Sequence, residues 1–151
     1  HLARICRYGG AVEGWYSVAE HSVLMSDWFV AVGDAWSARY ALLHDSPEAY
    51  LGDVVRPLKP ELIGYKPIEA VIEGIVLRCA GLESTLPQTV KSADGLILGD
   101  ERKALFPPAT VVAHGWATRP TLGVTIHQWE RDRAKYEFLR RLRVLFPELG
   151  L

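Results

Sequence analysis

Length, composition and charge exclude several classes of protein. The chain has 151 residues, of which 49% are hydrophobic, which is enough for one domain with a core and too little for two. Its 17 Lys and Arg side chains are balanced by 18 Asp and Glu side chains, so the net charge does not favour nucleic acid or an acidic membrane surface. We therefore expect a single domain over residues 1–151, with neither of these partners.

The cysteines and the lack of a long apolar run predict a cytoplasmic location. Cys6 and Cys79 lie in unrelated apolar contexts without CxxC spacing, which is typical of buried reduced thiols. No stretch approaches the roughly 20 apolar residues that a membrane span needs. The sequence starts at His1 instead of a methionine, and we expect that part of the native N-terminus is missing.

Hydrophobic residues recur at helical spacing along most of the chain, which predicts an all-α fold. Residues 1–8 are expected to form the end of a helix that stops at two glycines. Ser17 and Glu20 have the spacing of a capping box, so a helix should begin there and continue to Gly33.

A second helix should follow and carry ligand-type residues at its end. Asp34 can cap this helix, which leads directly into His44 and Asp45. Ser46-Pro47 should then start a new turn, because serine is a good cap and proline suits the first helical position.

Prolines and glycines divide the second half of the chain. The segment from Gly52 to Pro67 contains three prolines and two glycines and is expected to be an irregular loop. Helices are expected over residues 67–79, 87–106 and about 125–146, with a loop over residues 109–124. The helix over 87–106 would place Asp94 near one face with Val90, Ile97 and Glu101.

Four residues on these predicted helices have side chains that bind metals: His21, His44, Asp45 and Asp94. Two imidazoles and two carboxylates suit a divalent transition metal such as zinc, manganese, cobalt or iron. Such a site can leave coordination positions open for water and a phosphate oxygen. The alternative is that each residue is only a hydrogen-bonded core or capping residue.

Three strings carry a resemblance to a known superfamily. They are SVAEHS at 17–22, HDSPEAYLGD at 44–53 and KSAD at 91–94, and together they resemble the HD-domain phosphohydrolases. The similarity extends from Arg4 to about Leu105 and is closest to 5′-deoxynucleotidases of the YfbR type and phage dATP triphosphohydrolases of the DatZ type. The resemblance implies an HD-domain helical bundle in which His21, His44, Asp45 and Asp94 hold the catalytic metal.

Two acidic residues near this set are candidates for catalysis. Glu48 follows His44 by four residues, so a helical turn would direct its carboxylate back toward the metal, where it can act as a general base. The resemblance implies the same role for Glu48. The alternative is a glutamate that only favours a helix N-terminus. Asp53 either orients the attacking water or the leaving group, or caps a turn.

Cationic residues are placed where they could bind phosphate. Arg7 precedes two glycines, Lys59 lies in the proline-rich loop, and Lys91 precedes Asp94 by one helical turn. For each of them the alternative is a solvated surface charge. The resemblance also implies that Tyr8 lies against the sugar and selects deoxyribose over ribose, although the related deoxynucleotidases often carry Trp at this position.

These features predict hydrolysis of a small deoxynucleotide by metal-activated water that Glu48 deprotonates. A dNTP triphosphohydrolase would attack the α-phosphorus, with additional Mg²⁺ on the phosphates, whereas a 5′-deoxynucleotidase would release phosphate from a dNMP. The strings CRYGG at 6–10 and YSVAEHS at 16–22 favour the triphosphohydrolase. A non-catalytic nucleotide or metal sensor is the alternative from another class. Five tryptophans, the near-neutral charge and the oligomers of similar enzymes favour a homo-oligomer.

Overall fold

The computed structural model describes residues 1–150, and within this range it is helical without any named strand. The helices are α1 (Val18–Ala31), α2 (Ala35–Leu43), α3 (Glu48–Leu51), α4 (Tyr65–Cys79), α5 (Gln88–Leu105), α6 (Pro108–Ala113) and α7 (Arg131–Leu145). Short 3₁₀ turns lie at Leu2–Arg4, Arg7–Gly10, Lys59–Glu61 and Pro147–Leu149. The predicted all-α class is therefore confirmed. Leu151, the last residue of the predicted domain, lies outside the described residues.

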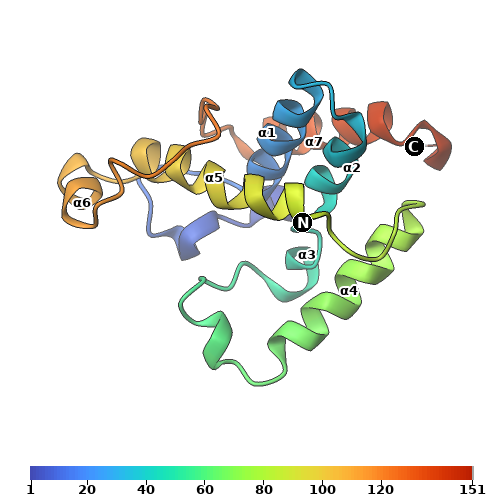
Figure 1. The fold of residues 1–151 in the computed structure, drawn as a ribbon, viewed down its shortest axis with the longest axis horizontal. Coiled ribbons are helices and arrows are strands. Elements are labelled where there is room, and N and C mark those ends of the chain that lie inside the picture. The colour runs from blue at the N-terminus through green and yellow to red at the C-terminus, as the bar shows by residue number, and fades with distance from the viewer. Residues whose placement is uncertain (151) are drawn as a thin grey trace.

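The helix α1 lies at the centre of the core. Every residue from Val18 to Ser26 is buried, because α2 and α7 pack along α1 and α5 crosses it (Figure 1). Fully buried Tyr16, Tyr40 and Phe146 fill the space around it. Since burying one large apolar side chain contributes about 1.5–3 kcal/mol, this packing fixes α1 and the polar residues that α1 carries.

Two of the three predicted helix caps, Ser17 and Asp34, are present. The Ser17 hydroxyl accepts a hydrogen bond from the backbone N–H of Glu20, and the Asp34 carboxylate accepts one from the N–H of Ser37. Ser46 does not act as a cap, and its buried hydroxyl has no hydrogen-bond partner. The starts of α1 and α2 thus follow from local sequence alone.

The Glu20 side chain does not complete a capping box, because it binds the distant C-terminal segment instead. Its two carboxylate oxygens accept hydrogen bonds from the backbone N–H groups of His127, Gln128 and Trp129. These N–H groups are therefore held in a non-helical arrangement, and Gln128 has a positive φ of 55°. The expected helix start near residue 125 was wrong for this reason, and α7 begins at Arg131.

Three other expected boundaries also differ from the structure. Residues 1–8 form 3₁₀ turns instead of a helix end, because the N–H of Arg7 bonds to the carbonyl of Tyr16. The helix α4 begins two residues before Pro67, since proline is tolerated in a first helical turn. The expected loop over 109–124 contains α6, which Pro108 starts in the position that suits proline best.

Both cysteines are more exposed than the sequence predicts. Cys6 is half-buried and Cys79 is exposed, so the expected burial of both thiols was wrong.

On α4 the apolar residues Ile68, Val71 and Ile75 remain exposed, although their spacing is that of a helix face. Among the described residues, no helix combines the length and apolar character needed to cross a bilayer.

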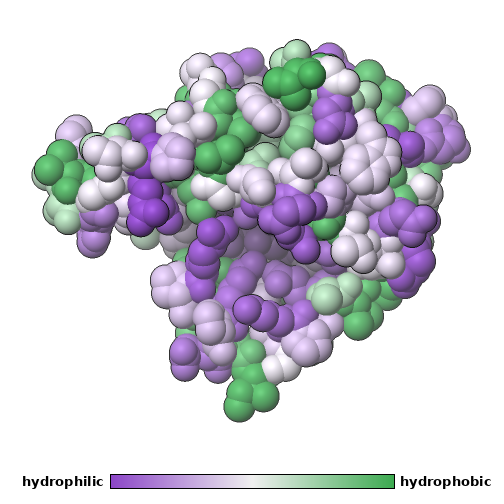
Figure 2. Space-filling view, in the orientation of Figure 1, coloured by the Kyte–Doolittle hydropathy of each residue, from purple (hydrophilic) through white to green (hydrophobic). Residues whose placement is uncertain are grey.

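The long segment between α3 and α4 creates a hollow next to α5. In Figure 1 this segment and α4 lie on one side of α3 and α5, while α1, α2 and α7 lie on the other. The space-filling view shows a depression lined by hydrophilic residues at this position (Figure 2). The helix α5 lines the cavity at this position with Asp94, Leu98 and Arg102.

Candidate metal centre

Three helices bring metal-binding side chains to one point. His21 comes from α1, His44 directly follows α2, and Asp94 lies on α5. One ligand atom from each residue lies within 4.8 Å of the other two. Both histidines are buried, with 0% and 7% of their surfaces exposed. Residues that are distant in the sequence therefore form a group that can hold one cation.

Hydrogen bonds fix the direction in which each imidazole presents its free nitrogen. Nδ1 of His44 lies 2.8 Å from the carbonyl oxygen of Ala41, which can only accept, so Nδ1 carries the hydrogen. Nδ1 of His21 lies 2.5 Å from Oε1 of Glu101 and donates to that carboxylate. In the neutral form each histidine therefore turns the lone pair of Nε2 toward the other residues of the group.

The two Nε2 atoms face one another at 3.2 Å. Two lone pairs at this distance repel unless a proton or a cation lies between them. Burial and the charge of Arg7 act to lower the pKa of His21. The carboxylates of Glu101 and Asp94 outweigh both, and the pKa of His21 rises to about 9. The surroundings of His21 thus favour positive charge.

Asp45 joins the same group. Its carboxylate oxygens lie 3.3 Å from Nε2 of His44 and 3.5 Å from Nε2 of His21, and Asp94 also lies 3.5 Å from Nε2 of His21. Asp45 thus lies beside both histidines, although the three residues whose ligand atoms all lie within 4.8 Å of one another are His21, His44 and Asp94. Asp45 also accepts a hydrogen bond from Nη1 of Arg7 at 2.9 Å, which orients its carboxylate.

The donor set fits a divalent transition metal. It consists of two imidazoles and two carboxylates, which is a common ligand combination for such ions. In each imidazole Nδ1 makes a hydrogen bond, which leaves Nε2 to bind the metal. The hydrogen bond from His21 to Glu101 is the outer contact that metal-binding histidines usually make. The 3.2 Å approach of the two Nε2 atoms is the observation that a cation, in place of a proton, would explain.

Glu101 is a site residue to which the sequence analysis assigned no role. It is fully buried on α5 and accepts hydrogen bonds from His21, Tyr8 and Tyr16, with Arg7 at 3.4 Å. Burial acts to raise the pKa of Glu101, but Arg7 and His21 outweigh burial and lower it to about 2. Its position seven residues after Asp94, on the same helix face, was the available signal.

Glu48 lies beside the metal ligands with one free oxygen. Only 3% of its surface is exposed, and the buried Oε2 has no hydrogen-bond partner. Oε1 lies 3.7 Å from Nζ of Lys59. Burial, followed by the charges of Asp45 and Asp53, raises the pKa of Glu48 to about 9. Glu48 is thus a carboxyl group that can hold a proton near neutral pH.

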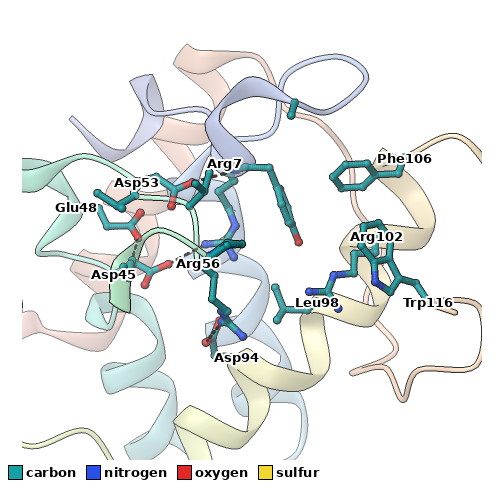
Figure 3. Close-up of a pocket in the computed structure, with 16 residues that line it drawn as sticks. Arg7, Asp45, Glu48, Asp53, Arg56, Asp94, Leu98, Arg102, Phe106 and Trp116 are labelled. Atoms are coloured by element: carbon teal, nitrogen blue, oxygen red, sulfur yellow. Dashed lines mark hydrogen bonds and ion pairs between the residues drawn. The ribbon is translucent and has the colours of Figure 1, made fainter. Parts of the chain in front are cut away.

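A cavity of about 320 Å³ opens beside these residues (Figure 3). Its lining comprises Arg7, Tyr8, Ala11, Asp45, Glu48, Asp53, Val54, Val55, Arg56, Pro57, Lys59, Asp94, Leu98, Arg102, Phe106 and Trp116. In Figure 3 the carboxylates lie together at one side, whereas Phe106 and Trp116 lie at the other. The cavity is therefore charged at the metal ligands and aromatic at the opposite end.

Most of the predicted substrate-binding residues line this cavity. Tyr8 adopts a positive φ of 59°, with its backbone N–H bonded to Asp53 at 3.0 Å and its hydroxyl bonded to Glu101 at 2.5 Å. Asp53 thus holds the backbone of Tyr8, which is a role that the sequence analysis did not consider. The guanidinium of Arg7 bonds to the carboxylates of the site.

The two predicted lysines differ in position. Lys59 lines the cavity and lies 2.9 Å from Glu69 in addition to its contact with Glu48. Lys91 is exposed and is not among the lining residues, although it lies close enough to Glu73 of α4 to affect the pKa of that residue. The structure therefore does not bring Lys91 to the cavity.

Two arginines at the cavity were not predicted. Arg56 reaches from the segment before α4 to Asp94, with 3.2 Å between Nη2 and Oδ2 (Figure 3). Arg102 lies on α5 and places its guanidinium over the ring of Trp116, 4.8 Å from the ring centre. The spacing of Asp94, Leu98 and Arg102 on one helix face was a usable signal for Arg102.

Comparisons with known proteins give two relatives of moderate identity. The chain is 39% identical over 104 residues to the uncharacterized protein YfdR of Escherichia coli. The aligned region covers 69% of this chain and 56% of YfdR. It is 37% identical over 99 residues to an uncharacterized protein of Rhodobacter capsulatus. Here the aligned region covers 61% of this chain and 50% of that protein. The chain thus spans about half the length of these relatives.

A weaker similarity leads to a protein of a different kind. The chain is 26% identical over 101 residues to the H/ACA ribonucleoprotein complex subunit CBF5 of Saccharomyces cerevisiae, covering 67% of this chain and 21% of CBF5. No family model matches the chain.

Proposed function

We propose that this protein is a metal-dependent phosphohydrolase of the HD-domain type that acts on a deoxynucleotide. The observation that carries the proposal is the 3.2 Å approach of the Nε2 atoms of His21 and His44, with Asp45 and Asp94 beside them. This arrangement favours a bound cation, and it lies at the floor of a cavity with basic side chains.

The protein's own residues supply the proton transfer and the orientation. A divalent metal, when bound, lowers the pKa of coordinated water and polarises a phosphoryl group. Glu48 carries a buried oxygen without a partner, and in the metal-free protein its pKa of about 9 keeps it protonated at neutral pH. The charge of a bound metal would lower this pKa, so that the carboxylate could then accept the proton that a nucleophilic water loses. Lys59 lies 3.7 Å from Glu48 and orients that carboxyl group.

Cationic residues around the cavity favour a phosphate ester as the substrate. Arg56 and Arg102 both line the cavity, and Arg7 lies between Asp45 and Glu101. Guanidinium groups bind phosphate oxygens in a planar fork, and they stabilise the charge that develops during phosphoryl transfer. The charged end of the cavity therefore suits the reacting phosphate.

The remaining part of the cavity suits a nucleoside. A volume of about 320 Å³ lies within the range of small-molecule sites. The ring of Tyr8 contacts Phe106 edge to face, with 5.3 Å between the ring centres, so both rings are held in place. We propose that the sugar lies against Tyr8 and that the fixed ring leaves little room for a 2′-hydroxyl.

The test is turnover of a substrate panel by the purified protein. Each dNTP and dNMP is incubated with Mn²⁺, Co²⁺ or Mg²⁺, and release of phosphate and triphosphate is followed. We expect metal-dependent hydrolysis of at least one nucleotide, which chelation by EDTA abolishes and Asp94→Asn reduces strongly. Binding of nucleotide and metal without turnover across the panel would overturn the proposal in favour of a sensor.

A further inference from the structure

A second cavity of about 310 Å³ adjoins the first one and is lined by three arginines. Its lining consists of Arg56, Gly95, Leu98, Gly99, Arg102, Arg119 and Pro120. Arg56, Leu98 and Arg102 line both cavities, so these side chains form the boundary between them. The sequence analysis assigned no role to any of the three arginines.

The positive charge of this second cavity is largely uncompensated. None of its seven lining residues is acidic. Within residues 1–150, Arg56 pairs with Asp94, while neither Arg102 nor Arg119 has a carboxylate oxygen within 4.0 Å. Converging guanidinium groups without carboxylates raise the local potential and attract anions.

The side chain of Arg102 and the segment that carries Arg119 are held in position around α5. The guanidinium of Arg102 lies over Trp116, and the opposite side of the cavity is formed by the segment that carries Arg119. Asp100 fixes that segment, because its carboxylate accepts hydrogen bonds from the N–H groups of Leu122 and Gly123 at 2.7 and 3.2 Å. Arg102 and the backbone beside Arg119 are thus in place before any anion arrives, which lowers the entropic cost of binding.

Gly99 allows the close approach on which this arrangement depends. A Cβ atom at Gly99 would lie 2.2 Å from the carbonyl oxygen of Pro120, so only glycine lets the segment contact α5 here. Lys103 also donates a hydrogen bond to the carbonyl oxygen of Arg119 at 3.3 Å. Several independent contacts therefore place Arg119 beside the same helix that carries Asp94.

The second cavity lies within reach of a ligand at the metal centre. Arg102 follows Asp94 by eight residues, which corresponds to about 12 Å along an α-helix. Side chains on a helix lean toward its N-terminus, so Arg102 reaches back toward Asp94. Arg56 contacts Asp94 directly and lines both cavities. A chain of phosphates that starts at the metal ligands would pass Arg56 and enter the second cavity.

We propose that the cavity of Arg56, Arg102 and Arg119 binds the β- and γ-phosphates of a nucleoside triphosphate whose α-phosphate lies at the metal centre. This inference rests on the proposed function and makes the substrate a triphosphate instead of a monophosphate. A monophosphate would leave Arg119 without an anionic partner. The same chemistry would suit a separate polyphosphate effector, and the experiment below distinguishes the two.

The first experiment measures binding of inorganic triphosphate to the metal-free protein by calorimetry. Arg119→Gln should weaken this binding by about tenfold or more, because a charge-assisted contact is lost. Arg143→Gln is the matched control, since Arg143 is exposed on α7 and lines neither cavity. Equal binding by the wild type, Arg119→Gln and Arg143→Gln would overturn the inference.

The second experiment compares dNTP and dNMP turnover. We expect Arg119→Gln to raise KM for the dNTP by about tenfold, with inorganic triphosphate as a competitive inhibitor of the wild type. If metal-dependent hydrolysis occurs only with dNMPs, the inference fails and the proposed function stands. If triphosphate changes kcat without competing, it is an effector and the inference also fails. No turnover of any nucleotide, with triphosphate binding that depends on Arg119, would overturn the proposed function and support the anion site.

Discussion

The carboxylate of Glu101 lies 2.5 Å from Nδ1 of His21, although 80 residues separate the two in the sequence. This contact connects α5 to α1 and fixes the imidazole so that its Nε2 faces His44 and the two aspartates. The same carboxylate accepts the hydroxyl hydrogen of Tyr8, which lines the cavity. Glu101 therefore links the metal ligands to the wall against which we place the sugar.

Replacing Glu101 should weaken metal binding. Glu101→Gln keeps the size of the side chain but removes the charge that makes His21 a better ligand, and loss of such an outer contact typically costs 10–100-fold in affinity. Competition titration with a chelating dye measures this change. Glu83→Gln is the control, because Glu83 is exposed and lies outside both cavities. Unchanged affinity in a folded Glu101→Gln protein would contradict this role.

Metal affinity should rise with pH up to about 9. In the metal-free protein the pKa of His21 is raised to about 9, so at neutral pH a metal must displace a proton from this residue. The apparent Kd should fall by about tenfold for each pH unit between roughly 6.5 and 9 and then level off. Calorimetry in buffers with different ionisation enthalpies counts the released proton. A Kd that is constant over this range would show that His21 is already neutral.

The raised pKa values also predict how stability changes with pH. For His21 and Glu48 the folded-state pKa of about 9 lies above the unfolded values of about 6.5 and 4.3. Each group therefore contributes stability that is full below its unfolded pKa and is lost as pH rises toward 9. We expect Tm of the metal-free protein to fall between pH 6.5 and 9, and Glu48→Gln to reduce this fall. A Tm that increases over this range would contradict the assignment.

Glu48→Gln should separate catalysis from metal binding. The amide cannot accept a proton from water, and removal of a general base typically lowers kcat by 10²–10⁴-fold. Metal affinity should change little, because Glu48 is not one of the four candidate ligands. Glu69→Gln is the matched control, since Glu69 also contacts Lys59, at 2.9 Å, but does not line the cavity. Equal losses of kcat in the two variants would assign the effect to Lys59.

Two glycines on α5 should respond oppositely to alanine. Gly99→Ala places a Cβ 2.2 Å from the carbonyl oxygen of Pro120, and overpacking of this kind costs about 1–3 kcal/mol. At Gly95 nothing lies within 4 Å of an added Cβ, so Gly95→Ala should stabilise the helix by about 0.5–1 kcal/mol. Urea unfolding of both variants tests the prediction. Similar stability of the two would show that the segment of Pro120 does not press on α5.

Local signals in the sequence were sufficient for the starts of α1 and α2. Ser17 and Asp34 each cap a helix through a neighbour three residues away, and such contacts depend only on local sequence. The ligand types of His21, His44, Asp45 and Asp94 were also visible, and the structure brings His21, His44 and Asp94 together with Asp45 beside the two histidines. Their convergence depends on the packing of three helices, which spacing alone does not determine.

Several features that escaped prediction depend on contacts between distant residues. The start of α7 is displaced because Glu20 binds the backbone N–H groups of residues 127–129. Glu101 looked like an ordinary member of an amphipathic helix until its partners were known. Lys91 has favourable spacing from Asp94, but it is exposed outside the cavity, whereas Arg56 reaches Asp94 from a loop.

The most direct test of this account is a titration of the metal-free protein with Mn²⁺ or Zn²⁺ by calorimetry. We predict one cation per chain in the wild type, with binding strongly weakened in His21→Ala and in Asp94→Asn and unchanged in Asp100→Asn, whose side chain serves only the neighbouring segment. Absence of saturable binding, or equal affinity in the wild type and Asp94→Asn, would contradict the central claim that these residues share a metal.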